Sequence, residues 1–444
     1  MPSGSLTYFV FVAAIFFLYW AAPRMGALRL LILLAASYFF CSRYGWFYVA
    51  LLPACATIDF AIGCALAASK STTFRRILVL TSVGLNITVL IASRHTGWVM
   101  PLGLSFYTLQ SLTYTLDLYR GDIDPARDIL SYLAAASFFP TLQAGPITRV
   151  AELLKQLEKR APLTAVEGGR AFFLIGLGLV KKVLIADFLA ENLVNRVFDT
   201  PNLYSGAEAL LAVYGYSLQL YYDFSGYTDI ARGAAQLLGI KLPANFDRPY
   251  LATNLTDFWR RWHISFSNWL RDYLYFSIPG QRTKIMPYFG LVITMVLGGL
   301  WHGATWNFVI WGALHGIALA AVRLWWAWRG KTRNPPLWKR AIAAVATYHF
   351  VCFTWIFFRA GSVSAALDLL SRIASLTAGF ENVTPLFALM LAAGFLALWL
   401  RHERLADRFA ASPFYVHAAA LLLIAMAIER MGATSSAPFV YSRF

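Results

Sequence analysis

The stretch from Asn254 to Tyr275 reads NLTDFWRRWHISFSNWLRDYLY, and it decides how the rest of the chain is interpreted. It places tryptophans, adjacent arginines and a histidine inside a sequence that is otherwise rich in long apolar runs. Five large apolar residues recur at intervals of three and four, which aligns them on one helical face. They are Phe258, Trp262, Phe266, Trp269 and Leu270. The pattern predicts one amphipathic helix that lies in the membrane interface or dips obliquely into the protein.

The composition around this stretch is that of an integral membrane protein. Of the 444 residues, 59% are hydrophobic and 14% are charged, whereas soluble domains carry roughly 25% charged residues. The mean hydropathy is +0.57, and the apolar runs approach the 20 or so residues that a helix needs to cross a bilayer. We therefore predict an all-α, polytopic membrane protein with about 11–12 transmembrane helices, which forms one domain over residues 1–444.

The basic residues indicate how the predicted spans are oriented. Lysine and arginine are dense in residues 70–76, 149–170 and 323–340, so the positive-inside rule places these loops in the cytoplasm. Three spans precede the first of these loops, which predicts an N-terminus outside the cytoplasm. The first apolar run is expected to be a retained span rather than a cleaved signal peptide. Shorter helices in the membrane plane are predicted near 128–139 and 225–238. The predicted spans are 6–22, 27–41, 45–69, 76–93, 98–119, 171–191, 206–222, 287–303, 305–326, 341–358, 384–401 and 415–430.

The net charge of +16 and the isoelectric point near 9.8 fit this topology and an interaction with anionic lipid or a phosphate-bearing substrate. Nucleic-acid binding is not favoured, because the cations lie in short loops between apolar runs. The cysteines lack the spacing of a zinc site, and a disulfide framework is not expected either. They are Cys41, Cys55, Cys64 and Cys352.

Histidines are the strongest candidates for chemistry. His302 lies in the stretch GGLWHGATWNFVIWGALHG, residues 298–316, between glycines that allow a backbone or a ligand to approach closely. A neutral imidazole can accept a proton near neutral pH, so His302 is a candidate general base and His263 a second polar group facing it. His315 is either a support for this pair or a core histidine. The remaining histidines are expected to be structural or interfacial: His95, His349, His402 and His417.

Other polar residues are expected to have structural roles. Ser105 lacks the GxSxG setting of a nucleophile. Asp223 and Asp229 are expected to fix helix ends or to pair with Arg232. The motifs of nucleotide hydrolases and dinucleotide-binding folds are absent. Residues 139–147 combine two prolines with a glycine at membrane depth, where irregular backbone lines a cavity or is buried in protein, so they are a candidate wall of a substrate tunnel.

Four stretches together resemble the membrane-bound O-acyltransferase (MBOAT) family over residues 98–330, with peripheral spans at 1–93 and 340–430. The resemblance is to the bacterial branch that contains the membrane subunits of alginate and peptidoglycan O-acetyltransferases, with the teichoic-acid D-alanyl transferase as a more distant relative. The stretches are LGLSFYTLQSLTYTLDLYRG, FFPTLQAGPITR, the segment from YYDFSGYTD to WLRDYLY, and GGLWHGATWNFVIWGALHG.

This resemblance implies an enzyme with a ring of helices around a central tunnel. His302 matches the family's near-invariant histidine, and His263 matches its second polar position; Trp301 and Trp262, their neighbours in sequence, are assigned supporting roles. The acyl donor is expected to be cytoplasmic acetyl-CoA, with no permanently bound cofactor. A separate periplasmic SGNH-type protein is expected to complete the transfer of the acetyl group to a glycan. The chain itself is therefore expected in the bacterial inner membrane, between the cytoplasmic donor and this partner. Basic residues are expected to gather the phosphates of coenzyme A: Arg260, Arg261, Arg271, Arg149 and Lys155.

Three alternatives remain at this point. A transporter of glycan or lipid would carry inverted repeats of discontinuous spans, and the sequence contains no internal repeat. A lipid O-acyltransferase would use the same chemistry on a different acceptor. An assembly platform would not require the histidines. Peptidoglycan, alginate and similar polysaccharides are all open as acceptors.

Overall fold

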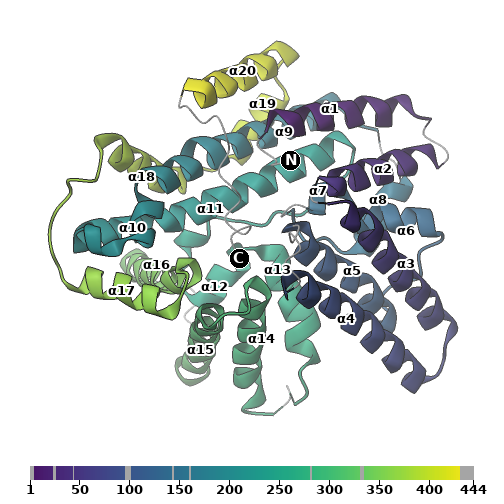
Figure 1. Ribbon diagram of the computed structural model, residues 1–444, viewed down its shortest axis with the longest axis horizontal. Helices are drawn as coiled ribbons and strands as arrows, with labels where there is room; N and C mark the ends of the chain where they lie inside the picture. The colour runs from purple at the N-terminus through teal and green to yellow at the C-terminus, as the bar shows by residue number, and fades with distance from the viewer. Residues whose placement is uncertain are drawn as a thin grey trace.

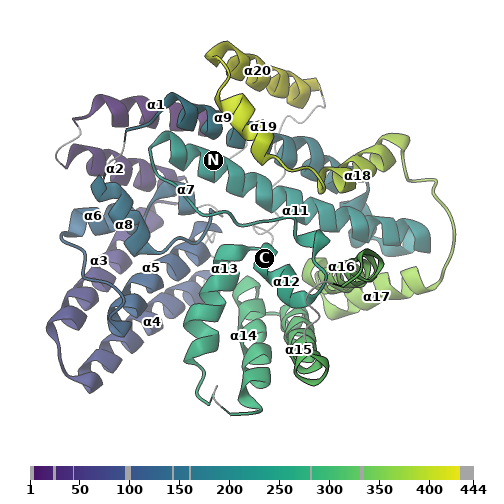
Figure 2. The same ribbon diagram turned by 180° about the vertical axis from the view of Figure 1, so that it is seen from behind.

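The helices of the chain are arranged around the stretch 254–275. The computed structural model describes residues 5–23, 27–43, 45–95, 102–142, 145–159, 162–280, 283–330 and 335–430, and all its regular elements in these ranges are helical. The stretch forms α12 (Leu255–Arg261) and α13 (Ile264–Trp269) near the middle of the molecule. Helices α1–α5 lie on one side of it and α16–α18 on the other, as the two opposite views show (Figures 1 and 2).

The N-terminal side is a group of packed helices with its own buried apolar cluster. Its long members are α1 (Leu6–Ala21), α2 (Leu28–Ser42), α3 (Trp46–Ala68), α4 (Thr72–His95) and α5 (Leu102–Arg120). Three shorter helices follow, α6 (Ile129–Ala136), α7 (Phe139–Leu142) and α8 (Val150–Lys159). The in-plane helix predicted near 128–139 therefore corresponds to α6 and α7, whereas α8 was not predicted as a helix.

Helices α14 (Met286–His302) and α15 (Trp306–Arg329) pack tightly against each other beside α12. A Cβ atom on Gly299 would collide with the backbone of Phe308, and one on Gly303 would collide with the ring of the same residue. These glycines bring the two helices together at the turn that carries His302. The chain then continues through α16 (Leu337–Arg359), α17 (Val363–Ala374), α18 (Pro385–Ala397), α19 (Glu403–Ala410) and α20 (Phe414–Arg430).

The predicted boundary between a span at 206–222 and a separate helix at 225–238 is wrong. The structure has one helix, α11 (Gly206–Leu237), which begins at a capping box between Ser205 and Glu208. Gly226 does not interrupt it; a Cβ atom there would lie 2.7 Å from the carbonyl oxygen of Gly178 in the neighbouring α9 (Ala165–Leu179). The glycine therefore serves close helix packing rather than a helix end.

Helix α9 continues beyond its predicted limits through two π-helical segments, Val180–Asp187 and Ala190–Val194, into α10 (Asn195–Asp199). Because a π-helix bonds residue i to residue i+5, it brings Lys182 and Asp187 to the same face. Such segments occur often at functional sites.

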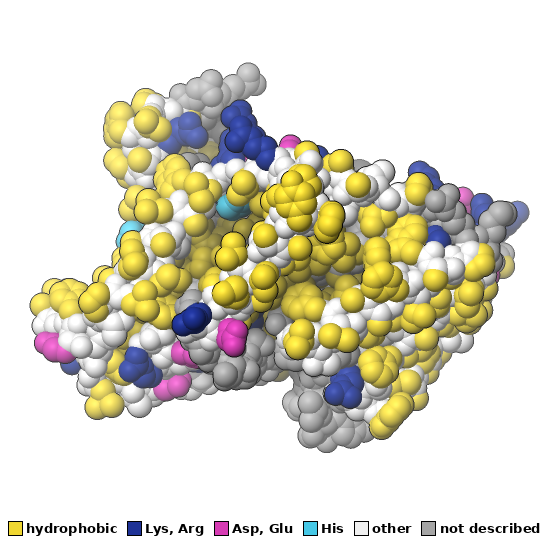
Figure 3. All heavy atoms as spheres, turned by 90° about the horizontal axis from the view of Figure 1, so that it is seen from above, with side chains coloured by type: hydrophobic (Ala, Val, Ile, Leu, Met, Phe, Trp, Pro, Cys, Tyr) yellow, Lys and Arg dark blue, Asp and Glu magenta, His cyan; other side chains and the backbone are white. Residues whose placement is uncertain are grey.

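Several helices have the length and apolarity of membrane spans. In the described part of the chain, α3, residues 72–93 of α4, α15 and α16 are long and apolar enough to cross a bilayer. Shorter apolar helices include α1, α2, α14 and α18. Hydrophobic side chains cover much of the surface seen in Figure 3. Large apolar residues that are more than half exposed include Leu6, Trp46, Trp306 and Leu422. The chain is thus a multi-pass membrane protein, while the number of its crossings stays a prediction.

Candidate active site

His263 lies at a break in the stretch that was predicted as one helix. Helix α12 ends at Arg261, and His263 has a φ of +42°, in the left-handed region, which costs energy for a residue with a Cβ atom. Asn245 holds the restart of the helix in place: its backbone oxygen accepts from the N–H of Ile264 at 2.9 Å, and its side-chain oxygen accepts from the N–H of Ser265 at 3.1 Å. The prediction of one continuous helix over 254–275 is therefore wrong, although the residues of its apolar face are buried.

His302 approaches from a different element. It is the last residue of α14, directly before Gly303, and its side chain is among the buried polar groups. The rings of Phe308, Trp311 and Phe358 lie around it, with centroids 5.1–6.1 Å from that of the imidazole. The ring thus lies inside the protein rather than against lipid.

The two histidines converge on one phenylalanine. The ring of Phe266 stacks on His263 with the centroids 4.9 Å apart, and its other neighbours include His302 at 5.6 Å and Trp301 at 4.6 Å. Both histidines are buried, with 1% and 5% of their surface exposed. His263 and His302, which are 39 positions apart in the chain, thus belong to one aromatic cluster. In this cluster, Nε2 of His263 has no hydrogen-bond partner among the described residues.

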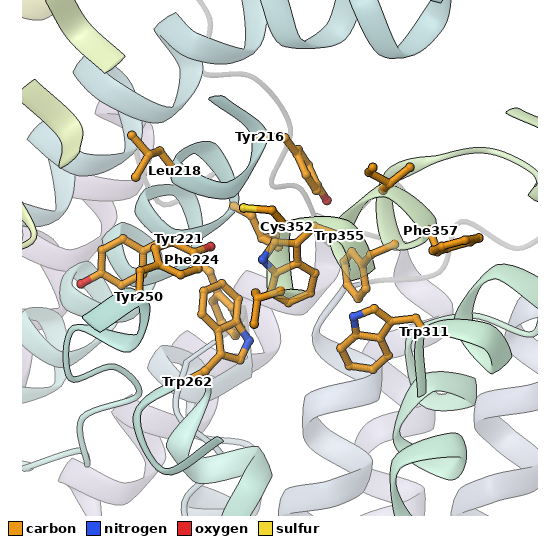
Figure 4. Packing of buried hydrophobic residues seen from close by; sticks show 14 of the residues in the cluster. Tyr216, Leu218, Tyr221, Phe224, Tyr250, Trp262, Trp311, Cys352, Trp355 and Phe357 are labelled. Atoms are coloured by element: carbon orange, nitrogen blue, oxygen red, sulfur yellow. The ribbon is translucent and has the colours of Figure 1, made fainter. Parts of the chain in front are cut away.

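Trp262 and Trp301 flank this cluster. Trp262 packs between Phe246, Tyr250 and Trp355 at centroid distances of 5.0–5.8 Å. Figure 4 shows Trp262 together with Tyr250 and Trp355. Trp301 contacts Phe106 at a centroid distance of 5.5 Å. Each tryptophan thus packs among aromatic rings directly before one of the two imidazoles in sequence, while the contribution of the tryptophans to activity stays a prediction.

His315 forms a separate tether. Its Nδ1 accepts from the indole N–H of Trp259 at 3.3 Å, and its Nε2 lies 2.9 Å from Oγ1 of Thr354. Since the Thr354 hydroxyl donates to the carbonyl of Val351, Nε2 of His315 is the donor to Thr354. Both ring nitrogens are engaged, and the ring joins α12, α15 and α16. This placement favours the structural alternative for His315.

We expect His315→Ala to destabilise the protein without removing its chemistry. The substitution leaves the indole N–H of Trp259 buried without its acceptor, at a cost of about 1–3 kcal/mol. The apparent Tm in detergent should fall, while acyl transfer per folded molecule should stay within about threefold of wild type, well below the loss for a catalytic group. Exposed His349, replaced by alanine, is the control. A normal Tm combined with lost activity would instead assign His315 to the reaction.

The predicted phosphate-binding cations do not form one group. Arg149 donates to Asp272 at 2.8 Å and lies 3.6 Å from Asp117, and it lines a cavity of about 300 Å³. Arg271 pairs with the same Asp272 from outside this cavity. Arg261 pairs with Asp257, whereas Arg260 and Lys155 are exposed. The structure therefore brings together Arg149 and Arg271 and leaves the other three apart.

The cavity beside Arg149 reaches the residues that follow His263. Its walls include Thr113, Ile147, Asn268 and the two residues that follow His263, Ile264 and Ser265. Ile147 belongs to the segment predicted to line a tunnel; its N–H donates to the hydroxyl of Ser265 at 2.9 Å. Residues 143 and 144 of that segment lie outside the described part of the chain.

Two buried aspartates pair with lysines that were not predicted as their partners. Asp229 contacts Lys181 at 2.6 Å and Arg232 at 3.3 Å, so one of the predicted pairs is present. Asp223 instead pairs with Lys182 at 2.7 Å. A charge pattern along α9 alone could not identify this partner, because the π-helical turn changes which face Lys182 occupies.

The remaining candidates have packing roles in the structure. Ser105 is buried in α5. His349 bonds Tyr214 at 2.9 Å, and His417 lies 2.6 Å from the carbonyl of Phe409. Cys41, Cys55 and Cys352 are buried free thiols, and Cys64 is exposed. Within the described ranges, no three His, Cys, Asp or Glu residues are grouped to hold a metal ion.

A multi-pass helical membrane protein with two imidazoles in a buried aromatic cluster is the class that this fold and site define. A model of the membrane-bound O-acyltransferase family matches residues 62–361. The chain belongs to the MBOAT family and is a membrane-embedded acyltransferase.

Curated relatives agree with this assignment. The chain is 32% identical to a protein named probable alginate O-acetylase AlgI of Azotobacter vinelandii, over 100% of this chain and 99% of the relative. It is 32% identical to the peptidoglycan O-acetyltransferase of Helicobacter pylori, over 85% of this chain and 78% of the relative. A teichoic acid D-alanyltransferase of Bacillus subtilis is 31% identical, over 58% of this chain and 68% of the relative.

Proposed function

We propose that this protein transfers an acetyl group from cytoplasmic acetyl-CoA, across the bacterial inner membrane, for O-acetylation of a cell-surface polysaccharide. The observation that carries the proposal is the convergence of His263 and His302 on Phe266. Relatives named for alginate and peptidoglycan O-acetylation support the reaction class and the kind of acceptor.

In the proposed reaction, His302 is the general base. An imidazole nitrogen of His302 takes the proton of an acceptor hydroxyl while the hydroxyl oxygen attacks the thioester carbonyl. His263, whose Nε2 is buried without a protein partner among the described residues, donates to the developing oxyanion or to the acceptor. The C–S bond then breaks, and the proton on His302 passes to the departing thiolate. The products are an acetyl ester and a free thiol.

The donor is proposed to reach the histidines through the cavity beside Arg149. This cavity is lined by the cation Arg149, by the carboxylates of Glu152 and Asp272, and by Ile264 and Ser265, the two residues after His263. An arginine suits a phosphate because its planar guanidinium donates two hydrogen bonds at once. Arg149 is already paired with Asp272, so a phosphate would exchange with that carboxylate.

The acceptor is proposed to be a polysaccharide hydroxyl, reached directly or through a periplasmic SGNH-type partner. Peptidoglycan and alginate are both compatible with the relatives' names. A lipid acceptor is the competing possibility, because the chemistry at the histidines is the same for any alcohol.

The proposal is tested with purified protein in nanodiscs and acetyl-CoA labelled in the acetyl group. We expect release of free thiol that depends on an added partner or on a surrogate alcohol, with label in the water-soluble ester. His263→Ala should lose most of the rate, and His349→Ala should match wild type. Label recovered in extracted lipid would identify a lipid acyltransferase, and no thiol release with either acceptor would contradict acetyl-CoA as donor.

A further inference from the structure

A second site lies where α9 meets the C-terminal helices; its lining includes neither His263 nor His302, although it extends to Asn245, which holds the backbone after His263. Two cavities adjoin there, one of about 680 Å³ with many charged residues and one of about 420 Å³ with an almost wholly apolar lining. The two cavities have lining residues in common from two parts of the chain. The shared residues include Phe173 and Leu177 of α9, Lys181 of the π-helical segment that follows it, and Ala397, Leu400 and His402 of the α18–α19 segment.

Helix α19 separates the polar from the apolar cavity. Its residues Glu403 and Asp407 line the polar cavity, while Leu405 and Phe409 line the apolar one. A short helix with one charged and one apolar face is typical of the boundary between headgroups and acyl chains. The apolar cavity continues along α20, which exposes Leu422 and Leu423 on its outer side. The polar cavity thus adjoins the apolar cavity in the same way as the headgroup of a lipid adjoins its acyl chains.

The charges of the polar cavity restrict the headgroup. Five lysines and arginines and five aspartates and glutamates line it. Several already form pairs, such as Arg170 with Asp407 at 2.7 Å and Lys241 with Glu167 at 2.9 Å. A surface with balanced charge offers no net attraction to an anionic lipid. It suits a headgroup that carries a phosphate and an ammonium together, because each charge finds partners of the opposite sign.

We propose that this double cavity binds one zwitterionic phospholipid of the phosphatidylethanolamine type. An acyl chain fills the apolar cavity along α20, because an empty apolar void would forfeit dispersion contacts of its lining. The headgroup lies between α9 and α19, with its ammonium toward Glu403 and its phosphate toward Lys181, where the phosphate exchanges with the carboxylate of Asp229 that Lys181 contacts at 2.6 Å. The bound lipid holds the C-terminal helices against α9.

The test is retention of lipid by the full chain, measured by native mass spectrometry after delipidation from nanodiscs that contain equal phosphatidylethanolamine and phosphatidylglycerol. We expect one retained phosphatidylethanolamine on the wild type. Ala420→Trp, which fills the apolar cavity from α20, should lower retention about tenfold, equivalent to about 1.4 kcal/mol. Ala419→Trp is the matched control, because Ala419 is exposed on the same helix and does not line the cavity.

A second variant keeps the proposal testable if Ala420→Trp fails to fold. Glu403→Lys gives the polar cavity a net positive charge and should shift retention toward phosphatidylglycerol. Equal retention in Ala420→Trp and Ala419→Trp, or an unchanged headgroup preference in Glu403→Lys, would overturn the proposal. So would equal thermal protection by water-soluble glycerophosphoethanolamine, which would indicate a free headgroup ligand. None of these measurements depends on acetyl transfer.

Discussion

Replacement of His302 by alanine is expected to lower the rate of acyl transfer by about 10² to 10⁴, the range that a general base contributes. The loss should appear mainly in kcat, because the imidazole acts on the hydroxyl proton in the transition state rather than in donor binding. The measurement is the steady-state rate of thiol release by the purified variant with saturating donor and acceptor.

The control for this prediction is folding. The apparent Tm of His302→Ala should stay near that of wild type, because the neighbouring rings of Phe308, Trp311 and Phe358 remain packed. Exposed His349 replaced by alanine should keep full activity. A folded His302→Ala protein that turns over at the wild-type rate would remove the general-base assignment.

Replacement of Lys182 by methionine is expected to cause the largest loss of stability. The ammonium of Lys182 lies 2.6 Å from Asp187 and 2.7 Å from Asp223, with 1% of its side chain exposed. Removing it leaves two buried carboxylates without this cation, and breaking a buried ion pair in this way costs about 3–5 kcal/mol. We expect a large drop in apparent Tm and in the yield of folded protein.

Lys181→Met is the matched control for that substitution. Lys181 is the adjacent residue, but its partner Asp229 keeps a second cation, Arg232, at 3.3 Å. Its loss should therefore be smaller. Adding Asp223→Asn to Lys182→Met should recover part of the stability, because one uncompensated charge is removed. Equal stability of the two lysine variants would show that the buried pair does not support the fold.

Much of the fold could be predicted from hydropathy. The predicted spans at 287–303 and 305–326 differ from α14 and α15 by at most three residues at either end. Prediction failed at the boundary placed between residues 222 and 225, because the structure has one continuous helix there. Gly226, just after that boundary, permits close contact with Gly178 inside helix α11. Contact between helices cannot be derived from one helix alone.

At the candidate site, too, the sequence predicted which residues are buried but not which elements contact each other. Periodicity aligned Phe258, Trp262 and Phe266 on one face, and all three are buried. It could not reveal the break at His263, because the backbone there is held by Asn245, which lies 18 residues earlier in the chain. Phe266, which both histidines contact, was identified only as part of an apolar face. The role of Lys182 depends on a π-helical turn that has no clear pattern in sequence.

A double-mutant cycle on His263 and His302 tests most directly whether the two imidazoles serve one reacting centre. Rates of thiol release would be measured for wild type, His263→Ala, His302→Ala and the double variant. If both rings act on the same transition state, the double variant should be barely slower than His302→Ala. Losses in activation free energy that simply add, to within about 0.5 kcal/mol, would show that the histidines act independently and would contradict the account.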